Sequence, residues 1–277
     1  MALLRLCFIL LALVAGAPAP AQSPDDARVK QCASQHPVGV ARAHCLAPWL
    51  EDIVAQQGAG TAMQAAERLV RSGVMNDCHV MAHTVGHASW RKTRELRAAF
   101  GACSTNCIQG CWHGVVEASM MGPAGQRIET KQALAFCDAL GQRTLERRQC
   151  LHGIGHGIMH QQRNDLQAAV AQCEALGAHD ERFQCLGGLW MQWAHFPAHE
   201  GAESFGNKAP ELCAEVRKDL LGRCAHAVGG AAMFATGHDE TRSKAICRRL
   251  PSAQQRECVK GVRHEIDVLR HHGVHQH

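Results

Sequence analysis

The chain has 277 residues and a formal net charge of +4 at pH 7, too small an excess of positive charge to indicate a nucleic-acid-binding protein. It contains no tyrosine, and only 4% of its residues are aromatic. Because the strands of β-sandwiches and β-barrels favour aromatic and β-branched residues, this composition disfavours both folds. Alanine, leucine, arginine, glutamine and glutamate fill the long segments, which predicts a mostly helical protein.

Residues 1–21 have the pattern of a signal peptide. Arg5 supplies a positive start, residues 6–14 form an apolar run, and Ala19-Pro20-Ala21 offers the small residues at which signal peptidase cleaves. The apolar run is shorter than the ~20 residues that span a bilayer, and no second run of that kind follows it. We therefore expect an exported protein, periplasmic or secreted, without a membrane span.

Short blocks of similar sequence recur along the rest of the chain. They are 83–87 (HTVGH), 113–117 (HGVVE), 152–156 (HGIGH), 187–191 (GGLWM), 226–230 (HAVGG) and 260–264 (KGVRH), with a fainter copy that begins at Ala47. The mean interval is about 36 residues, the length of one helical hairpin in a solenoid. We predict a single all-α domain over residues 22–268, an α-solenoid or toroid of about seven antiparallel hairpins. A flexible histidine-rich tail over 269–277 would follow.

Cysteines accompany most of these blocks. Without Cys7, which belongs to the signal peptide, 14 of the 15 cysteines remain, and an even number in an exported chain indicates disulfides. Each of five pairs spans a helix end and a helix start, so a disulfide would join the two helices of one hairpin. Zinc sites usually take cysteines two to four residues apart, which fits these pairs badly. The five pairs are Cys32 and Cys45, Cys137 and Cys150, Cys173 and Cys185, Cys213 and Cys224, and Cys247 and Cys258.

Four cysteines fall outside this pattern. Cys103, Cys107 and Cys111 are spaced at i, i+4 and i+8, and on one continuous helix they would form a row of thiolates. The even count and the oxidising destination favour two more disulfides instead. We expect Cys103 to pair with Cys111, and Cys78 with Cys107.

Three successive blocks carry i, i+4 pairs of histidines, or of a histidine and a glutamate: His83 with His87, His113 with Glu117, and His152 with His156. This spacing lets two imidazoles on one helix face share an ion. The cysteine two residues before each block is expected to face the first helix of its hairpin. The histidine positions then point away from that helix, into a groove shared with neighbouring hairpins. Imidazole with an occasional carboxylate predicts a transition metal, Cu or Zn or else Fe. The candidate ligands are His83, His87, His113, Glu117, His152, His156 and His226, and His79 and His160 extend two of the pairs by one turn.

Other histidines have simpler interpretations. His195 and His199 lie in a stretch with proline and glycine, residues 195–210, which we expect to form a long loop at the rim of the groove. The tail histidines, His271, His272, His275 and His277, are expected to be solvated. The candidate ligands themselves have an alternative role as polar side chains that hydrogen-bond to a neighbouring repeat.

Three functions are compatible with these features. The first is an exported protein that binds a transition metal through the histidines. The second is a metal-free scaffold whose groove binds a peptide or protein, which resembles tetratricopeptide-type repeats in architecture only. The third is a metal-dependent oxidative or hydrolytic enzyme with Glu117 as general base. No phosphate-binding loop, nucleophile elbow, HExxH or CxxCH motif is present.

Overall fold

The computed structural model describes residues 27–122, 125–142 and 144–272, and over these ranges the regular secondary structure is all helical, with no strand. The expected signal peptide, residues 1–21, lies outside the described residues. No helix in the described part of the chain combines the length and the apolar character needed to cross a membrane. The helices are α1 (Ala27–Gln35), α2 (Val40–Gln57), α3 (Ala59–Arg71), α4 (His79–Thr93), α5 (Leu96–Gly101), η1 (Cys107–Gln109), α6 (Gly110–Met120), α7 (Thr130–Asp138), α8 (Leu145–Gln161), α9 (Leu166–Glu174), α10 (His179–Ala198), α11 (Ala202–Leu212), η2 (Lys218–Leu220), α12 (Leu221–Ala235), α13 (Glu240–Cys247) and α14 (Ser252–His272).

Short polar side chains mark where several helices begin. Thr144 accepts a hydrogen bond from the backbone of Arg147 at the start of α8. Asp165 and Asp239 cap α9 and α13 in the same way. Each cap satisfies one of the backbone N–H groups that a helix start leaves unpaired, and is worth about 1 kcal/mol. The boundaries of these hairpins are therefore encoded locally.

The predicted disulfide bonds are present and join neighbouring helices. Their Cα atoms are between 5.1 and 5.9 Å apart, within the range of unstrained disulfides. Cys107 has a left-handed backbone, so the segment from Cys103 to Cys111 is not one continuous helix and cannot present three sulfurs on one face. The disulfides are Cys32–Cys45, Cys78–Cys107, Cys103–Cys111, Cys137–Cys150, Cys173–Cys185, Cys213–Cys224 and Cys247–Cys258.

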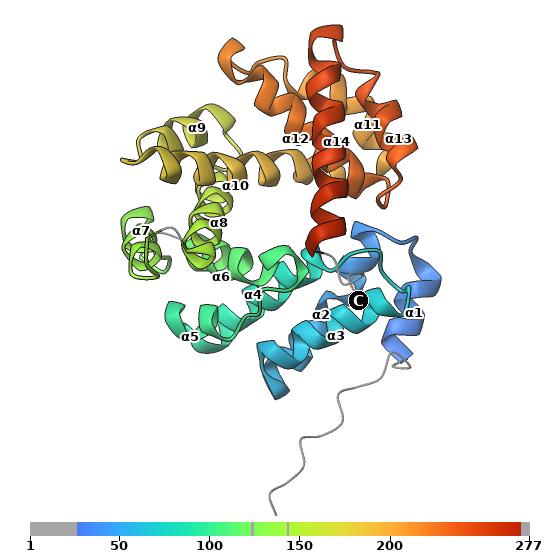
Figure 1. The fold of residues 1–277 in the computed structure, drawn as a ribbon. Helices are drawn as coiled ribbons and strands as arrows, with labels where there is room; N and C mark the ends of the chain where they lie inside the picture. The colour runs from blue at the N-terminus through green and yellow to red at the C-terminus, as the bar shows by residue number, and fades with distance from the viewer. Residues whose placement is uncertain (1–26, 123–124, 143, 273–277) are drawn as a thin grey trace, which may run out of the picture.

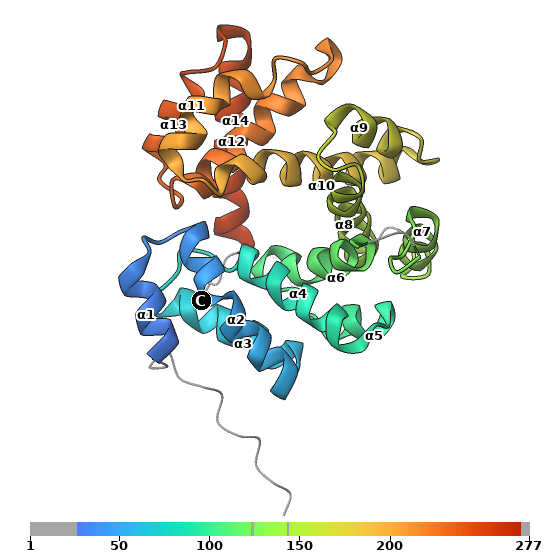
Figure 2. The same ribbon diagram turned by 180° about the vertical axis from the view of Figure 1, so that it is seen from behind.

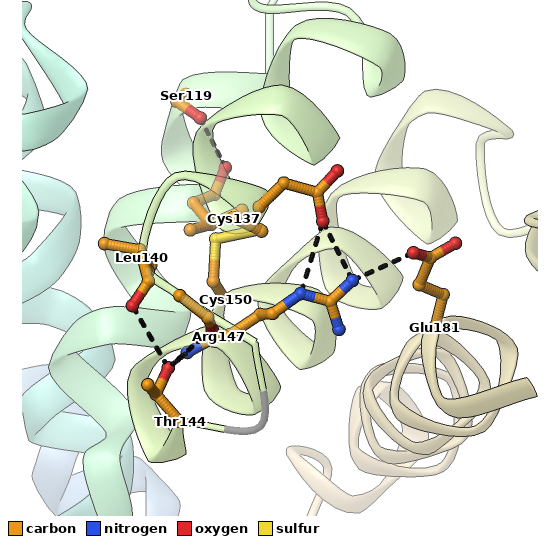
Figure 3. Close-up of a disulfide and its surroundings, with 10 residues drawn as sticks. Ser119, Cys137, Leu140, Thr144, Arg147, Cys150 and Glu181 are labelled. Carbon is orange, nitrogen blue, oxygen red and sulfur yellow. Dashed lines mark hydrogen bonds and ion pairs between the residues drawn. A yellow bond between two sulfur atoms is a disulfide. The ribbon is translucent and has the colours of Figure 1, made fainter. Parts of the chain in front are cut away.

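Beside one disulfide, a buried arginine joins two neighbouring hairpins (Figure 3). Arg147 on α8 pairs with Asp138, at the end of α7, over 2.8 Å. The same guanidinium pairs with Glu181, at the start of α10, over 2.9 Å. Because one carboxylate comes from its own hairpin and the other from the next, Arg147 fixes the position of one hairpin relative to the other.

Six helices contact one another in chain order, α4 with α6, then α8, α10, α12 and α14 (Figure 1). Glycine makes this contact close. A Cβ added at Gly155 would lie 2.0 Å from the carbonyl oxygen of Cys185, and one at Gly188 would lie 1.9 Å from that of His152. Only glycine allows these backbones to approach so closely.

The C-terminal helices also lie beside the N-terminal ones (Figure 2). Asn76, just before α4, donates a hydrogen bond to the carbonyl oxygen of Gly237 over 2.7 Å. Asp77 is 3.3 Å from His238 in an ion pair, and the His79 ring is 6.3 Å from that of Phe234. The start of α4 is thus enclosed between α6 and the end of α12.

The structure corrects one expectation about a loop. The stretch from 195 to 210 is not a long loop, because α10 continues to Ala198 and α11 begins at Ala202. Pro197 lies in the last turn of α10, where a missing N–H removes one hydrogen bond without breaking the helix. His195 is therefore helical. At the C-terminus, α14 extends to His272, and the tail over 269–277 stays a prediction. His275 and His277 lie outside the described residues.

Candidate metal centre

Five histidines from three neighbouring helices form one group of contacting rings, here called the histidine cluster. His79 and His83 come from α4, His113 from α6, and His152 and His156 from α8. Ring centroids are 4.8 Å apart for His79 and His83, 5.0 Å for His83 and His156, and 4.5 Å for His113 and His152. The three helices converge closely enough for their imidazoles to act together.

Ligand atoms in this region lie close enough to share an ion. Those of His79, His83 and His113 are all within 4.8 Å of one another, as are those of His113, His152 and His156. A third group with the same spacing contains His83, His87 and Glu117. Two nitrogens bound to one zinc ion at about 2.0–2.1 Å are at most about 4.2 Å apart, so small side-chain rotations would close each group around a metal.

Hydrogen bonds determine which nitrogen of His79 and His83 carries the proton. His83 donates from Nδ1 to Oε2 of Glu117 over 3.0 Å. His79 donates from Nδ1 to the carbonyl oxygen of Cys107 over 3.2 Å. A neutral imidazole has one N–H, so Nε2 carries a lone pair in both rings.

These two lone-pair nitrogens face each other at 3.2 Å. With both protons already donated to oxygen acceptors, no hydrogen lies between them. Two ligands at adjacent corners of a tetrahedral zinc site are about 3.3 Å apart, which is the separation found here. The pair is arranged as metal ligands are, with each outer nitrogen hydrogen-bonded to an oxygen.

His113 and His156 repeat this arrangement with glutamine side chains. His113 donates from Nε2 to Oε1 of Gln149 over 2.5 Å, and His156 donates from Nδ1 to Oε1 of Gln192 over 2.9 Å. The other nitrogen of each ring is buried and has no hydrogen-bond partner among the residues that the structure describes. The Nε2 atom of His152 is also buried and unpartnered. Buried polar atoms without partners are costly, and a metal ion would satisfy all three.

Glu117 is the negatively charged residue beside the histidine cluster, and it is only 3% exposed. Besides the bond from His83, it accepts bonds from His87 over 3.0 Å and from His160 over 2.8 Å. Burial alone would raise the pKa of Glu117, but the charge of His87 and the three hydrogen bonds outweigh it and hold the pKa well below its usual value. Glu117 is therefore ionised, with both oxygens engaged by imidazoles.

Burial keeps the cluster imidazoles neutral. It lowers the pKa of His83 to about 3 and that of His156 to about 4. The pKa values of His113 and His152 are also well below the ordinary value, mainly through burial and secondly through neighbouring histidines. Neutral imidazole is the form that binds metals.

The sequence candidates do not all meet at this site. His226 lies on α12, outside the three groups, with its ring 5.4 Å from that of His264. His79, which the sequence suggested only as an extension of a pair, is a full member of the cluster. Sequence analysis missed Gln149 and Gln192, because no local pattern distinguishes a glutamine that orients a ligand from a solvated one.

Comparison of the chain with protein-family models, curated proteins and solved structures finds no match in any of the three. The chemistry of the site therefore has to be inferred from its own geometry.

Proposed function

We propose that this protein is an exported transition-metal-binding protein whose ion is held by the histidine cluster. The main support is the pair formed by His79 and His83, whose lone-pair nitrogens lie 3.2 Å apart with no proton available between them. His113, His152 and His156 each add a buried nitrogen without a partner. Glu117 then orients His83 and supplies negative charge, and His87 in turn donates a hydrogen bond to Glu117. An imidazole-rich set suits Cu, Zn or Fe.

The proposal includes an architecture and a location. The helical hairpins would be repeats closed into a ring, because second helices contact in chain order and residues before α4 bond to the end of α12. Seven disulfides support an oxidising destination, the periplasm or the exterior.

Metal analysis of untagged, disulfide-bonded protein tests this function. We expect at least one Cu, Zn or Fe per chain after dialysis, and a loss of at least tenfold in affinity for His113→Ala. His179→Ala is the matched control, because His179 is exposed at the start of α10 and should leave binding unchanged. Protein that purifies without metal and takes up none of the three ions would contradict the proposal and favour a metal-free scaffold.

A further inference from the structure

A cavity of about 630 Å³ lies between α8, α10, α12 and α14, next to the histidine cluster. Its size is within the range of small-molecule pockets. Trp190, Met191 and His152 line it, as do His226 and Glu265. Phe183 is half exposed, and Arg223 lies 5.5 Å from the centre of its ring, so this pair forms the solvent side of the cavity.

Glycines create the space. Gly187 stands at the first position of its block, where the two preceding blocks have His113 and His152. Gly230 stands at the fifth position of its block, where earlier blocks have Glu117 and His156. A Cβ at Gly230 would meet nothing closer than 4.0 Å, and one at Gly187 nothing closer than 3.4 Å, so helix packing does not require glycine at either position. Glycine inside a helix costs about 1 kcal/mol relative to alanine. A ligand that fills the cavity would explain why no side chain projects from these positions.

A buried carboxyl group faces this space. Glu265 on α14 is 8% exposed, and its Oε2 lies 4.0 Å from where a Cβ at Gly230 would be. Within the described ranges, no hydrogen bond or ion pair engages it. The other carboxylate of the cavity, Glu257, already pairs with Lys260 over 2.9 Å. Among the described residues, Glu265 thus has no counter-ion, and a buried carboxyl group stays neutral unless a counter-ion lets it ionise.

We propose that the cavity binds a small organic cation, a protonated amine with an apolar or aromatic body. The ammonium group would pair with Glu265, and the body would pack against Trp190 and Met191. Trp190 also offers an aromatic face, which attracts cations. Neither an anionic nor a neutral ligand would supply the positive charge that Glu265 needs in order to ionise in this buried position.

The pKa of Glu265 is compatible with this occupant. Burial, and secondly the charge of Asp77, raise it to about 8, so in the vacant cavity the group is largely protonated at neutral pH. An ammonium ion would favour the ionised form and lower this pKa. The cavity lies beside the histidine cluster, and His152 belongs to both. Binding of the cation does not depend on a metal.

Three matched probes test the proposal by titration calorimetry at about pH 8, where an alkylamine is still protonated. Tryptamine, tryptophol and indole-3-acetate share one aromatic body and differ in charge. We expect tryptamine to bind at least tenfold more tightly than the other two. In Glu265→Gln this preference should disappear, while Glu240→Gln, an exposed carboxylate on α13, should retain it.

A second variant tests whether tryptamine binds in the cavity. Gly230→Met should fill the space and weaken tryptamine binding at least tenfold, with the helical circular dichroism of the wild type retained. Equal binding of the three probes, no saturable binding of tryptamine, or an unchanged preference in Glu265→Gln would each overturn the proposal. Tryptamine is titrated into both chelator-treated and metal-loaded protein. Because binding of the cation does not depend on a metal, a loss of metal binding alone leaves tryptamine binding unchanged, so the two failures can be distinguished.

Discussion

The histidine cluster and the cavity region each contain one buried glutamate, and the two carboxyl groups have opposite environments. Glu117, between α4, α6 and α8, accepts hydrogen bonds from three histidines and has a lowered pKa. Glu265, on α14, has no partner among the described residues and a pKa raised to about 8. Similar helix packing therefore produces a filled polar cluster in one region and an open cavity in the other. The side chains at a few matching positions on α6, α8, α10 and α12 determine whether a polar cluster or a cavity is formed.

The largest expected effect on stability distinguishes a glycine packed against a neighbouring helix, Gly229, from a glycine that faces the cavity, Gly230. Gly229→Ala should destabilise the protein by more than about 3 kcal/mol, because the new Cβ would lie 2.0 Å from the carbonyl oxygen of Cys258. Gly230→Ala should instead stabilise it by about 0.5–1 kcal/mol through helix propensity. Urea unfolding of both variants measures the difference. A similar loss of stability in both would mean that the cavity is not open at Gly230.

Removal of a disulfide should have the next largest effect. Replacing both Cys137 and Cys150 by serine releases a loop that spans 13 residues, worth about 3 kcal/mol in the chain-entropy model. This disulfide joins α7 to α8, the helix that carries His152 and His156. We expect a lower melting temperature by calorimetry, with metal affinity retained once the protein is folded. Lost affinity in the folded variant would show that the disulfide also positions the ligands.

The contrast between the two glutamates predicts a smaller, specific effect on metal binding. Glu117→Gln removes the negative charge that orients His83, and loss of such an outer partner typically lowers metal affinity by 10–100-fold. Glu265→Gln should leave metal affinity within about twofold, since none of the hydrogen bonds, ion pairs or ligand groups of the described residues joins Glu265 to the histidine cluster. Competition with a chromogenic chelator measures both. Equal losses in the two variants would contradict the separation of the two regions.

Much of the helical architecture could be predicted from sequence because its signals are local. Cysteine spacing, capping residues and the i, i+4 histidine pairs are each visible within a dozen residues. The partners of the histidines could not be predicted in this way, since Gln149 acts on a histidine 36 residues earlier, through contact between neighbouring hairpins. The same limit applies to His226, whose block matches the others although its helix lies outside the cluster.

Proline was misleading for a related reason. The stretch from 195 to 210 suggested a loop because it contains Pro197 and Pro210, but both prolines lie inside helices. Each removes a single backbone hydrogen bond near a helix end, a cost that tertiary packing offsets. A proline therefore indicates a helix boundary to within a turn, but not the length of the loop that follows.

The last expected effect concerns the dependence of stability on pH and is measured as a slope per pH unit. The pKa of Glu265 is about 8 in the folded protein, against 4.5 for an ordinary glutamate, so folding favours its protonated form. Its contribution to stability is complete below about pH 4.5 and is lost as pH rises to about 8, by up to about 1.4 kcal/mol per pH unit. Glutamine cannot ionise, so Glu265→Gln should gain stability relative to the wild type across this window.

Urea unfolding of metal-free wild type and Glu265→Gln at several pH values between 5 and 8 measures this slope. The other titratable groups that face Glu265, which are Asp77 with its partner His238 and the two histidines His226 and His264, are common to both proteins and largely cancel in the difference. Glu240→Gln, which removes an exposed carboxylate paired with Lys244, should follow the wild-type curve closely. Parallel curves for Glu265→Gln and the wild type would show that the carboxyl group is already paired or hydrated, and the cavity would then lack the unpaired charge that distinguishes it from the cluster around Glu117.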